Sequence, residues 1–263
     1  MESTLTPEAA LAGLAWQIEL GATEAIGDVP VNRYALPEKA AKPAARPADA
    51  VPARPAPAAA QADPLAEAEA AARAAPTLDA LRDAMAAYPH CALRRGARNL
   101  VFADGNPAAR VMILGEAPGR EEDVAGRPFV GRAGQLLDRM LAAIGLDRGA
   151  EDRARAVYIA NVLPWRPPPG RDPQPEEIAM MRPFVARHVA LAAPDFLILM
   201  GNTSCEAGLN RRGISRLRGQ WAEAFGRPAL PMFHPAYLLR NPAAKREAWA
   251  DLLCLRARLG PLA

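Results

Sequence analysis

The segment GEAPGREEDVAGRPFVGRAGQLLD, residues 115–138, carries the strongest structural signal in this sequence. An apolar run, ARVMIL (109–114), leads into it, and the helical pattern AGQLLDRMLAAIG begins near its end. Five glycines and two prolines punctuate the stretch. This order predicts a buried strand, a glycine-rich loop and then the N-terminus of a helix. Ligands of open α/β sheets bind beyond the carboxyl ends of the strands, so we expect a ligand site at this loop.

Outward from this segment, apolar runs and helical patterns alternate along the chain. Strands are predicted near 110–115, 156–163, 195–201 and 229–233, and helices at 77–88, 132–145, 175–192, 202–210 and 243–259. Strands that alternate with helices form mainly parallel sheets, and unbroken apolar runs suit strands covered on both faces. The predicted fold is therefore α/β, a three-layer α/β/α sandwich around a mainly parallel four-stranded sheet.

The composition divides the chain into three parts. Residues 38–76 are almost wholly alanine, proline and small charged residues, which predicts a disordered linker because little apolar surface can be buried there. A compact domain is expected at 77–263. Residues 1–37 contain Leu11 and Leu14 near helical spacing. This N-terminal helical segment either packs back on the domain or docks a protein partner, and the sequence leaves both open.

Charge and cysteine content narrow the class of protein only slightly. The net charge is +3, but arginines cluster in NRRGISRLRG, which includes Arg216 and Arg218. Arginine suits phosphate oxygens, although a solvated surface is the plainer interpretation. Three scattered cysteines give no disulfide framework, and no apolar run is long enough to cross a bilayer. We expect a cytoplasmic protein without membrane contact, and a monomer.

The four loops after the predicted strands converge on one edge of the sheet and carry polar residues. The first contains four acids, has no Walker lysine and lacks GxGxxG spacing, which argues against a nucleotide-phosphate site. Activation of water or recognition of a neutral ring fits better. Phe129 is either core or a stacking platform, and Asn161 either caps its loop or reads an imide edge such as that of uracil. His234 could donate to an anion on a leaving group.

Three blocks of the sequence together resemble the uracil-DNA glycosylase superfamily, and family 4 most closely. They are GEAPGREEDVAGRPFVGRAGQLLD, NVLPWRPPPGRDPQPEEI and FHPAYLLRNPAAKREAWADL, in order within about residues 88–256. The resemblance implies a DNA repair enzyme that flips uracil out of DNA and hydrolyses its N-glycosidic bond, leaving an abasic site. The DNA is expected to be single- or double-stranded.

The resemblance also implies a role for individual residues. Uracil would be bound by Phe129 through stacking, by Asn161 through its amide, and by backbone groups of Glu116 and Ala117. His234 would stabilise negative charge on uracil O2. Glu122 or Asp123 would orient the attacking water or stabilise the cationic sugar. The residues that would contact DNA are Leu238, Leu239, Arg240, Arg216 and Arg218.

The sequence departs from family 4 at the iron–sulfur cluster. The family holds a [4Fe–4S] cluster with four cysteines, and the matching positions here are Tyr88, Cys91, Trp165 and Met181. One thiolate cannot replace four, so we predict no cofactor and no metal. An alternative function follows: a catalytically inactive, glycosylase-like protein that binds DNA or a partner. The retained Asn161 and His234 favour the enzyme.

Overall fold

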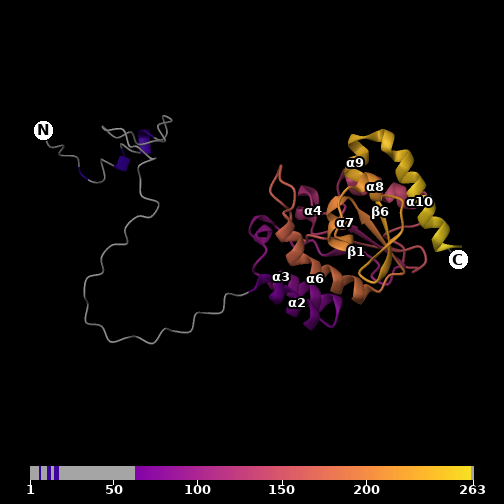
Figure 1. The fold of residues 1–263 in the computed structure, drawn as a ribbon, viewed down its shortest axis with the longest axis horizontal. Helices are drawn as coiled ribbons and strands as arrows, with labels where there is room; N and C mark the ends of the chain where they lie inside the picture. The colour runs from indigo at the N-terminus through magenta and orange to yellow at the C-terminus, as the bar shows by residue number, and fades with distance from the viewer. Residues whose placement is uncertain (1–5, 7–10, 13–14, 18–62, 262–263) are drawn as a thin grey trace, which may run out of the picture. The chain divides into compact units, whose positions relative to one another are not determined.

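The computed structural model describes residues 6, 11–12, 15–17 and 63–261 (Figure 1). The chain divides into two units, Met1–Pro57 and Ala58–Ala263. In the first unit the described residues include helical turns, in which Leu11 and Trp16 are exposed. Leu14 and the first part of the predicted linker, residues 38–62, lie outside the described residues.

The second unit is built on a six-stranded sheet with the order β1-β3-β2-β4-β6-β5. The strands are β1 (Ala103–Gly105), β2 (Val111–Gly115), β3 (Val157–Asn161), β4 (Phe196–Met200), β5 (Ala222–Ala224) and β6 (Arg227–Met232). The four central strands β3, β2, β4 and β6 are parallel, which confirms the predicted core of the sheet. The edge strands β1 and β5 were not predicted; each pairs antiparallel with its neighbour over three residues.

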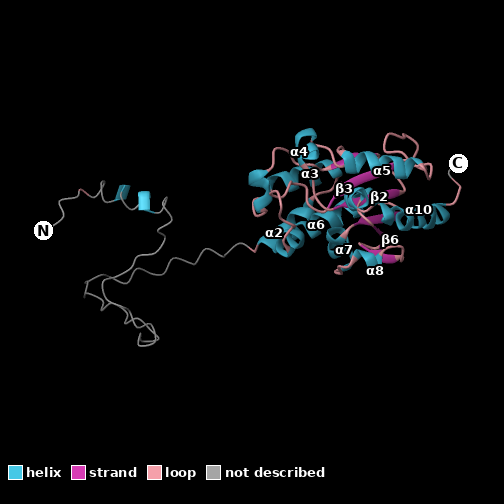
Figure 2. Ribbon diagram, turned by 90° about the horizontal axis from the view of Figure 1, so that it is seen from above, coloured by secondary structure: helices cyan, strands magenta, loops and turns pink. Residues whose placement is uncertain are grey.

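Helices cover both faces of the sheet, which confirms the three-layer sandwich (Figures 1 and 2). They are α2 (Pro64–Ala74), α3 (Leu78–Ala87), α4 (Arg120–Ala125), α5 (Arg132–Ala142), α6 (Pro175–Ala192), α7 (Asn202–Leu209), α8 (Ile214–Leu217), α9 (Pro235–Arg240) and α10 (Lys245–Leu259), with 3-10 turns η2 (Ala92–Gly96) and η3 (Pro242–Ala244). Alternate residues of β2 face opposite layers: Met112 and Leu114 pack with α2, α3, α6 and α7, and Val111 and Ile113 with α5 and α10. No described helix is both long and apolar enough to cross a membrane.

Helix α2 corrects the predicted boundary of the linker at residue 76. The helix begins after Asp63, whose carboxylate accepts the backbone N–H of Leu65 at 3.0 Å. Its buried face is made of Ala68 and Ala72, and the helix packs against α6. Alanine needs little room and loses no side-chain entropy, so an alanine-rich helix can approach a neighbour closely. The last part of the predicted linker therefore belongs to the folded domain.

Candidate active site

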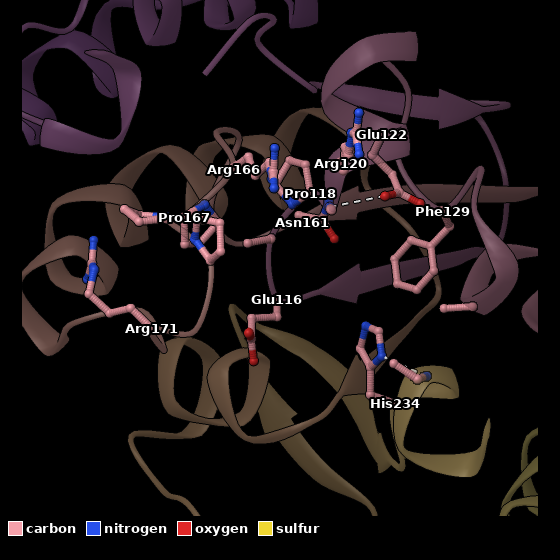
Figure 3. A pocket seen from close by; sticks show the side chains of 16 residues that line it. Glu116, Pro118, Arg120, Glu122, Phe129, Asn161, Arg166, Pro167, Arg171 and His234 are labelled. Atoms are coloured by element: carbon pink, nitrogen blue, oxygen red, sulfur yellow. Dashed lines mark hydrogen bonds between the residues drawn. The ribbon is translucent and has the colours of Figure 1, made fainter. Parts of the chain in front are cut away.

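A cavity of about 380 Å³ opens at the carboxyl ends of the central strands, where the ligand site was predicted (Figure 3). The first loop, the end of β3, the loop after it and the start of α9 all contribute to its wall. The lining residues are Glu116, Ala117, Pro118, Gly119, Arg120, Glu122, Phe129, Ala133, Asn161, Arg166, Pro167, Pro168, Pro169, Arg171, His234 and Ala236. The structure thus brings together all of the predicted uracil-binding residues, and Glu122 and His234.

The rings of Phe129 and His234 face each other across part of this cavity (Figure 3). Their centroids are 5.3 Å apart and their planes differ by 27°. Phe129 has a φ of 54°, in the left-handed region, which costs a non-glycine residue about 1–2 kcal/mol. A bulky residue keeps such a backbone only where its surroundings hold it.

Asn161 is the last residue of β3 and lies opposite Gly115 in the register of β2 and β3. Backbone hydrogen bonds continue beyond the strands, from the N–H of Val162 to the carbonyl of Gly115 and from Leu163 to Glu116, each at 3.0 Å. These bonds fix the backbone that follows Asn161. Asn161 is only 6% exposed, so its amide presents a donor and an acceptor in a largely dry wall.

His234 caps the N-terminus of α9 through its own ring. Its Nδ1 accepts the backbone N–H of Ala236 at 3.1 Å, which places the ring proton on Nε2. Burial, and to a smaller extent the positive charge of Arg240, lower the pKa of His234 to about 4, against the opposing effect of Glu122. The histidine is therefore neutral at pH 7 and still has an Nε2–H to donate.

The acidic residues near the cavity have different surroundings. Glu122 accepts three backbone N–H groups, from Gly119, Val130 and Gly131, at 2.9–3.0 Å, and so ties the loop around Phe129 together. Asp123 does not line the cavity. Its carboxylate instead accepts the backbone N–H groups of Arg98 and Asn99.

Glu116, from the first loop, is one of the residues that line the cavity (Figure 3). One carboxylate oxygen accepts the hydroxyl of Thr203 at 2.7 Å. Thr203 lies at the start of α7 and is buried. Its role was not predicted, because only the fold brings this helix to the first loop.

The structure corrects two of the predicted DNA contacts. Leu238 is 1% exposed and packs with Phe233 in the core, since it lies on the inner side of α9. Arg218 forms an ion pair with the buried Asp251 and donates to the carbonyl of Glu247 at 2.7 Å, so its guanidinium is already engaged.

Other basic residues remain exposed or line the cavity. Arg216 and Arg240 are exposed, and Leu239 is half-buried. The cavity wall includes Arg120 and Arg166, which the sequence did not single out because isolated arginines carry no local signal.

The residues at the four cluster positions do not fit an iron–sulfur cluster. Tyr88, Cys91, Trp165 and Met181 are each at most 3% exposed and belong to one core of apolar side chains. The hydroxyl of Tyr88 donates to the carbonyl of Pro64 at 2.7 Å, and burial raises its pKa to about 12. Burial also raises the pKa of the Cys91 thiol. A cluster needs four thiolates, and these positions offer one thiol, held in its neutral form.

Comparison with known proteins identifies the family of this chain. The family described as "Uracil DNA glycosylase superfamily" matches residues 102–253. A "Type-4 uracil-DNA glycosylase" of Thermotoga maritima is 40% identical over 154 residues, covering 57% of this chain and 77% of the relative. The protein of the same description from Archaeoglobus fulgidus is 38% identical over 170 residues, covering 61% and 82% respectively. On this match and these identities, the chain belongs to the uracil DNA glycosylase superfamily.

Proposed function

We propose that this protein is a uracil-DNA glycosylase, an enzyme that hydrolyses the N-glycosidic bond of uracil in DNA and leaves an abasic site. The observation that carries the proposal is the convergence of Phe129, Asn161 and His234 on one cavity. A planar ring, an amide and a neutral histidine are the groups that stacking, edge recognition and stabilisation of a leaving anion require. Relatives described as type-4 uracil-DNA glycosylases support it.

Recognition of uracil rests on the side-chain amide of Asn161. The amide oxygen accepts from uracil N3–H, while the amide nitrogen donates to O4. Cytosine presents an amine and a bare ring nitrogen at the same places, so both hydrogen bonds would be lost. Phe129 stacks on the ring of the extruded base, which is worth about 1–3 kcal/mol. The backbone of Glu116 and Ala117 completes the contact with the pyrimidine.

Cleavage of the bond is assisted by His234. When the bond between the sugar carbon C1′ and uracil N1 breaks, both electrons leave with the base, and negative charge develops on uracil O2. The Nε2–H of His234 donates to this oxygen, and a neutral imidazole does so without giving up its proton. Water then adds its oxygen to C1′ and loses a proton.

Glu116 is the acid that we propose to hold this water. Glu122 has its carboxylate occupied by three backbone N–H groups, and Asp123 lies outside the cavity wall. Glu116 has one oxygen fixed by Thr203, and its other oxygen accepts no hydrogen bond from residues 63–261. This oxygen can accept a proton of the attacking water. Glu122 then acts through the shape of the loop rather than on the water.

The DNA would lie across the mouth of the cavity. We expect phosphate oxygens to be bound by Arg120 and Arg166 at the cavity wall and by the exposed Arg216 and Arg240. Extrusion of the base costs a few kcal/mol and is cheapest in single strands and mismatches. We therefore expect activity on both single- and double-stranded uracil-DNA, with the single strand favoured.

We also infer that the enzyme works without an iron–sulfur cluster. Three of the four ligand positions hold Tyr88, Trp165 and Met181, which pack as an apolar plug. Purified protein should contain no stoichiometric iron and should lack the brown absorbance at about 400 nm that such clusters give. A full complement of four irons per chain would overturn this inference.

Two further expectations concern location and partners. We propose that the enzyme is a cytoplasmic monomer, which sedimentation of the full chain would test. Residues 1–37 are a candidate docking segment for a protein partner, because the described Leu11 and Trp16 expose 70% and 62% of their surface. A monomer of unchanged activity after removal of this segment would fit a docking role.

One assay tests the proposed function. The protein is incubated with an oligonucleotide that contains a single uracil, and abasic sites are then cleaved with alkali. We expect strand cleavage with uracil and none with thymine at the same position. Asn161→Ala, at the proposed recognition residue, should abolish cleavage. If the wild-type chain leaves every uracil substrate intact, in single and double strands, the inactive DNA-binding alternative replaces the enzyme.

A further inference from the structure

Arg148 lies in the turn after α5, outside the cavity wall, yet it contacts the backbone that carries the stacking ring. Its guanidinium donates to the carbonyl of Pro128 at 3.1 Å and to the carbonyl of Phe129 at 3.0 Å. These two carbonyls belong to the peptide groups on either side of Phe129. The orientations of these two planar peptide groups define φ and ψ of Phe129. The side chain of Arg148 therefore restrains both backbone torsions of Phe129.

Arg148 is itself held in place by two carboxylates. It donates to Asp138 of α5 at 2.8 Å and to Asp104 of β1 at 3.1 Å. Its side chain is 17% exposed, and that of Asp104 is 20% exposed, so solvent screens this pair only partly. The planar fork of arginine can serve four oxygens at once, which the single nitrogen of lysine cannot.

The conformation at Phe129 needs such support. Its φ of 54° is unfavourable for a bulky residue, and α5 begins close by, with Gly134 against the carbonyl of Phe129. Glu122 holds the next N–H, that of Val130, at 3.0 Å. The peptide group between Phe129 and Val130 is thus fixed at its oxygen by Arg148 and at its nitrogen by Glu122.

We propose that Arg148 is a positioning residue for uracil: it fixes the backbone on both sides of Phe129 and so keeps the stacking ring in the cavity beside His234. The inference rests on the proposed function for its catalytic consequence. Its structural half, that Arg148 fixes the position of the Phe129 ring, can be tested without measuring activity.

The structural half is tested by NMR of the histidine rings. The chain has three histidines, so the signal of His234 is identified by its loss in His234→Gln. Phe129 lies 5.3 Å from His234, close enough for its ring current to shift that signal. Arg148→Gln should move the His234 signal in the direction that Phe129→Leu moves it. An unmoved His234 signal in folded Arg148→Gln would overturn the proposal, whether or not the enzyme is active.

The catalytic half is tested by single-turnover rates on a uracil oligonucleotide, at a temperature where melting curves show all variants folded. Misplacement of a positioning group costs up to about a hundredfold, so we expect Arg148→Gln to lose about ten- to a hundredfold in rate. Arg148→Lys keeps the charge for Asp104 and Asp138 and should recover part of the loss. The matched control is Arg153→Gln, because Arg153 also bonds a carbonyl and a carboxylate but lies away from the cavity; its rate should be unchanged.

A double-mutant cycle separates positioning from general stabilisation. If Arg148 acts through the ring, Arg148→Gln should slow the wild-type enzyme but cost little in a Phe129→Leu background. Equal losses in both backgrounds would show that Arg148 acts elsewhere, and would overturn the proposal. An inactive wild-type enzyme would instead defeat the proposed function and leave the NMR test to decide the role of Arg148.

Discussion

The ring of Phe129 packs into the space that a side chain at Gly115 would need. A β-carbon built on Gly115 would come within 2.6 Å of two ring carbons of Phe129 and would also meet the amide oxygen of Asn161. Gly115 ends β2, so the glycine lets the platform and the recognition amide approach the same strand end. The close approach, rather than a special backbone conformation, explains this glycine.

Gly115→Ala should therefore displace both groups at once. We expect a loss of about a hundredfold in single-turnover rate, because small misplacements of reacting groups have effects of this size. Overpacking should also lower stability by about 1–3 kcal/mol. The matched control is Gly149→Ala, where the added carbon meets nothing closer than 3.6 Å. A Gly115→Ala enzyme with the wild-type rate would show that the packing of Phe129 against β2 is irrelevant to turnover.

Asn161→Asp should lose uracil release. A carboxylate accepts but does not donate, so it would face uracil O4 with a second acceptor. We expect a fall of at least about a hundredfold for uracil, since a buried polar mismatch discriminates strongly. Release of cytosine, whose amine can donate to the carboxylate, should rise. Rates on oligonucleotides with uracil or cytosine at one position measure both, with Asn106→Asp, outside the cavity wall, as the control. Unchanged uracil release would rule out the recognition role.

The pH dependence of the rate should reveal a neutral His234. Its pKa is lowered to about 4, so the ring stays neutral and able to donate Nε2–H at every pH above that value. The contribution of His234 to the rate should be constant between about pH 5.5 and pH 8 and should change only as pH falls toward 4. A catalytic imidazolium with an ordinary pKa would instead lose activity as pH rises through 6.5. His234 ring signals followed by NMR over the same range should show no titration, and a midpoint near 6.5 would contradict the prediction.

Tyr88→Phe should destabilise the domain without affecting catalysis. The substitution removes the hydroxyl that donates to the carbonyl of Pro64 and so ties α2 to the domain. We expect a loss of about 1 kcal/mol, which lowers Tm by about 2–4 °C for a domain of this size. Glycosylase rates below the melting range should be unchanged. Tyr237→Phe, at an exposed position, serves as the stability control. If both variants have the Tm of the wild type, the hydrogen bond from Tyr88 to Pro64 contributes nothing to the stability of the domain.

Much of the central fold could be read from local patterns. The strand ending at Gly115 and the long helix Pro175–Ala192 each have an apolar pattern of sufficient length, and the structure has both where they were predicted. The edge strands of three residues have no such pattern, because neighbours in space define them. Helix α2 did have a start signal, Asp63 followed by Pro64, which the alanine and proline composition obscured.

Two residues of the site were predictable because they lie at or just after the end of a strand. Asn161 and His234 each lie at a strand end, and the topology alone brings them to one cavity. Arg148 carries no local signal, since its contacts with Pro128 and Phe129 exist only in the fold. Leu238 was misassigned to the DNA because its position in the motif does not tell which side of a short helix it occupies.

The order of the strands also governs when the cavity can exist during synthesis. β2 lies between β3 and β4, and His234 follows β6, which pairs with β4 and β5. A ribosome-bound chain that has released Glu116 and Asn161 but not β6 therefore has two walls of the cavity and no donor for the leaving base. Contacts so distant along the chain form late. A nascent chain of this protein cannot act on DNA until nearly all of its domain has emerged.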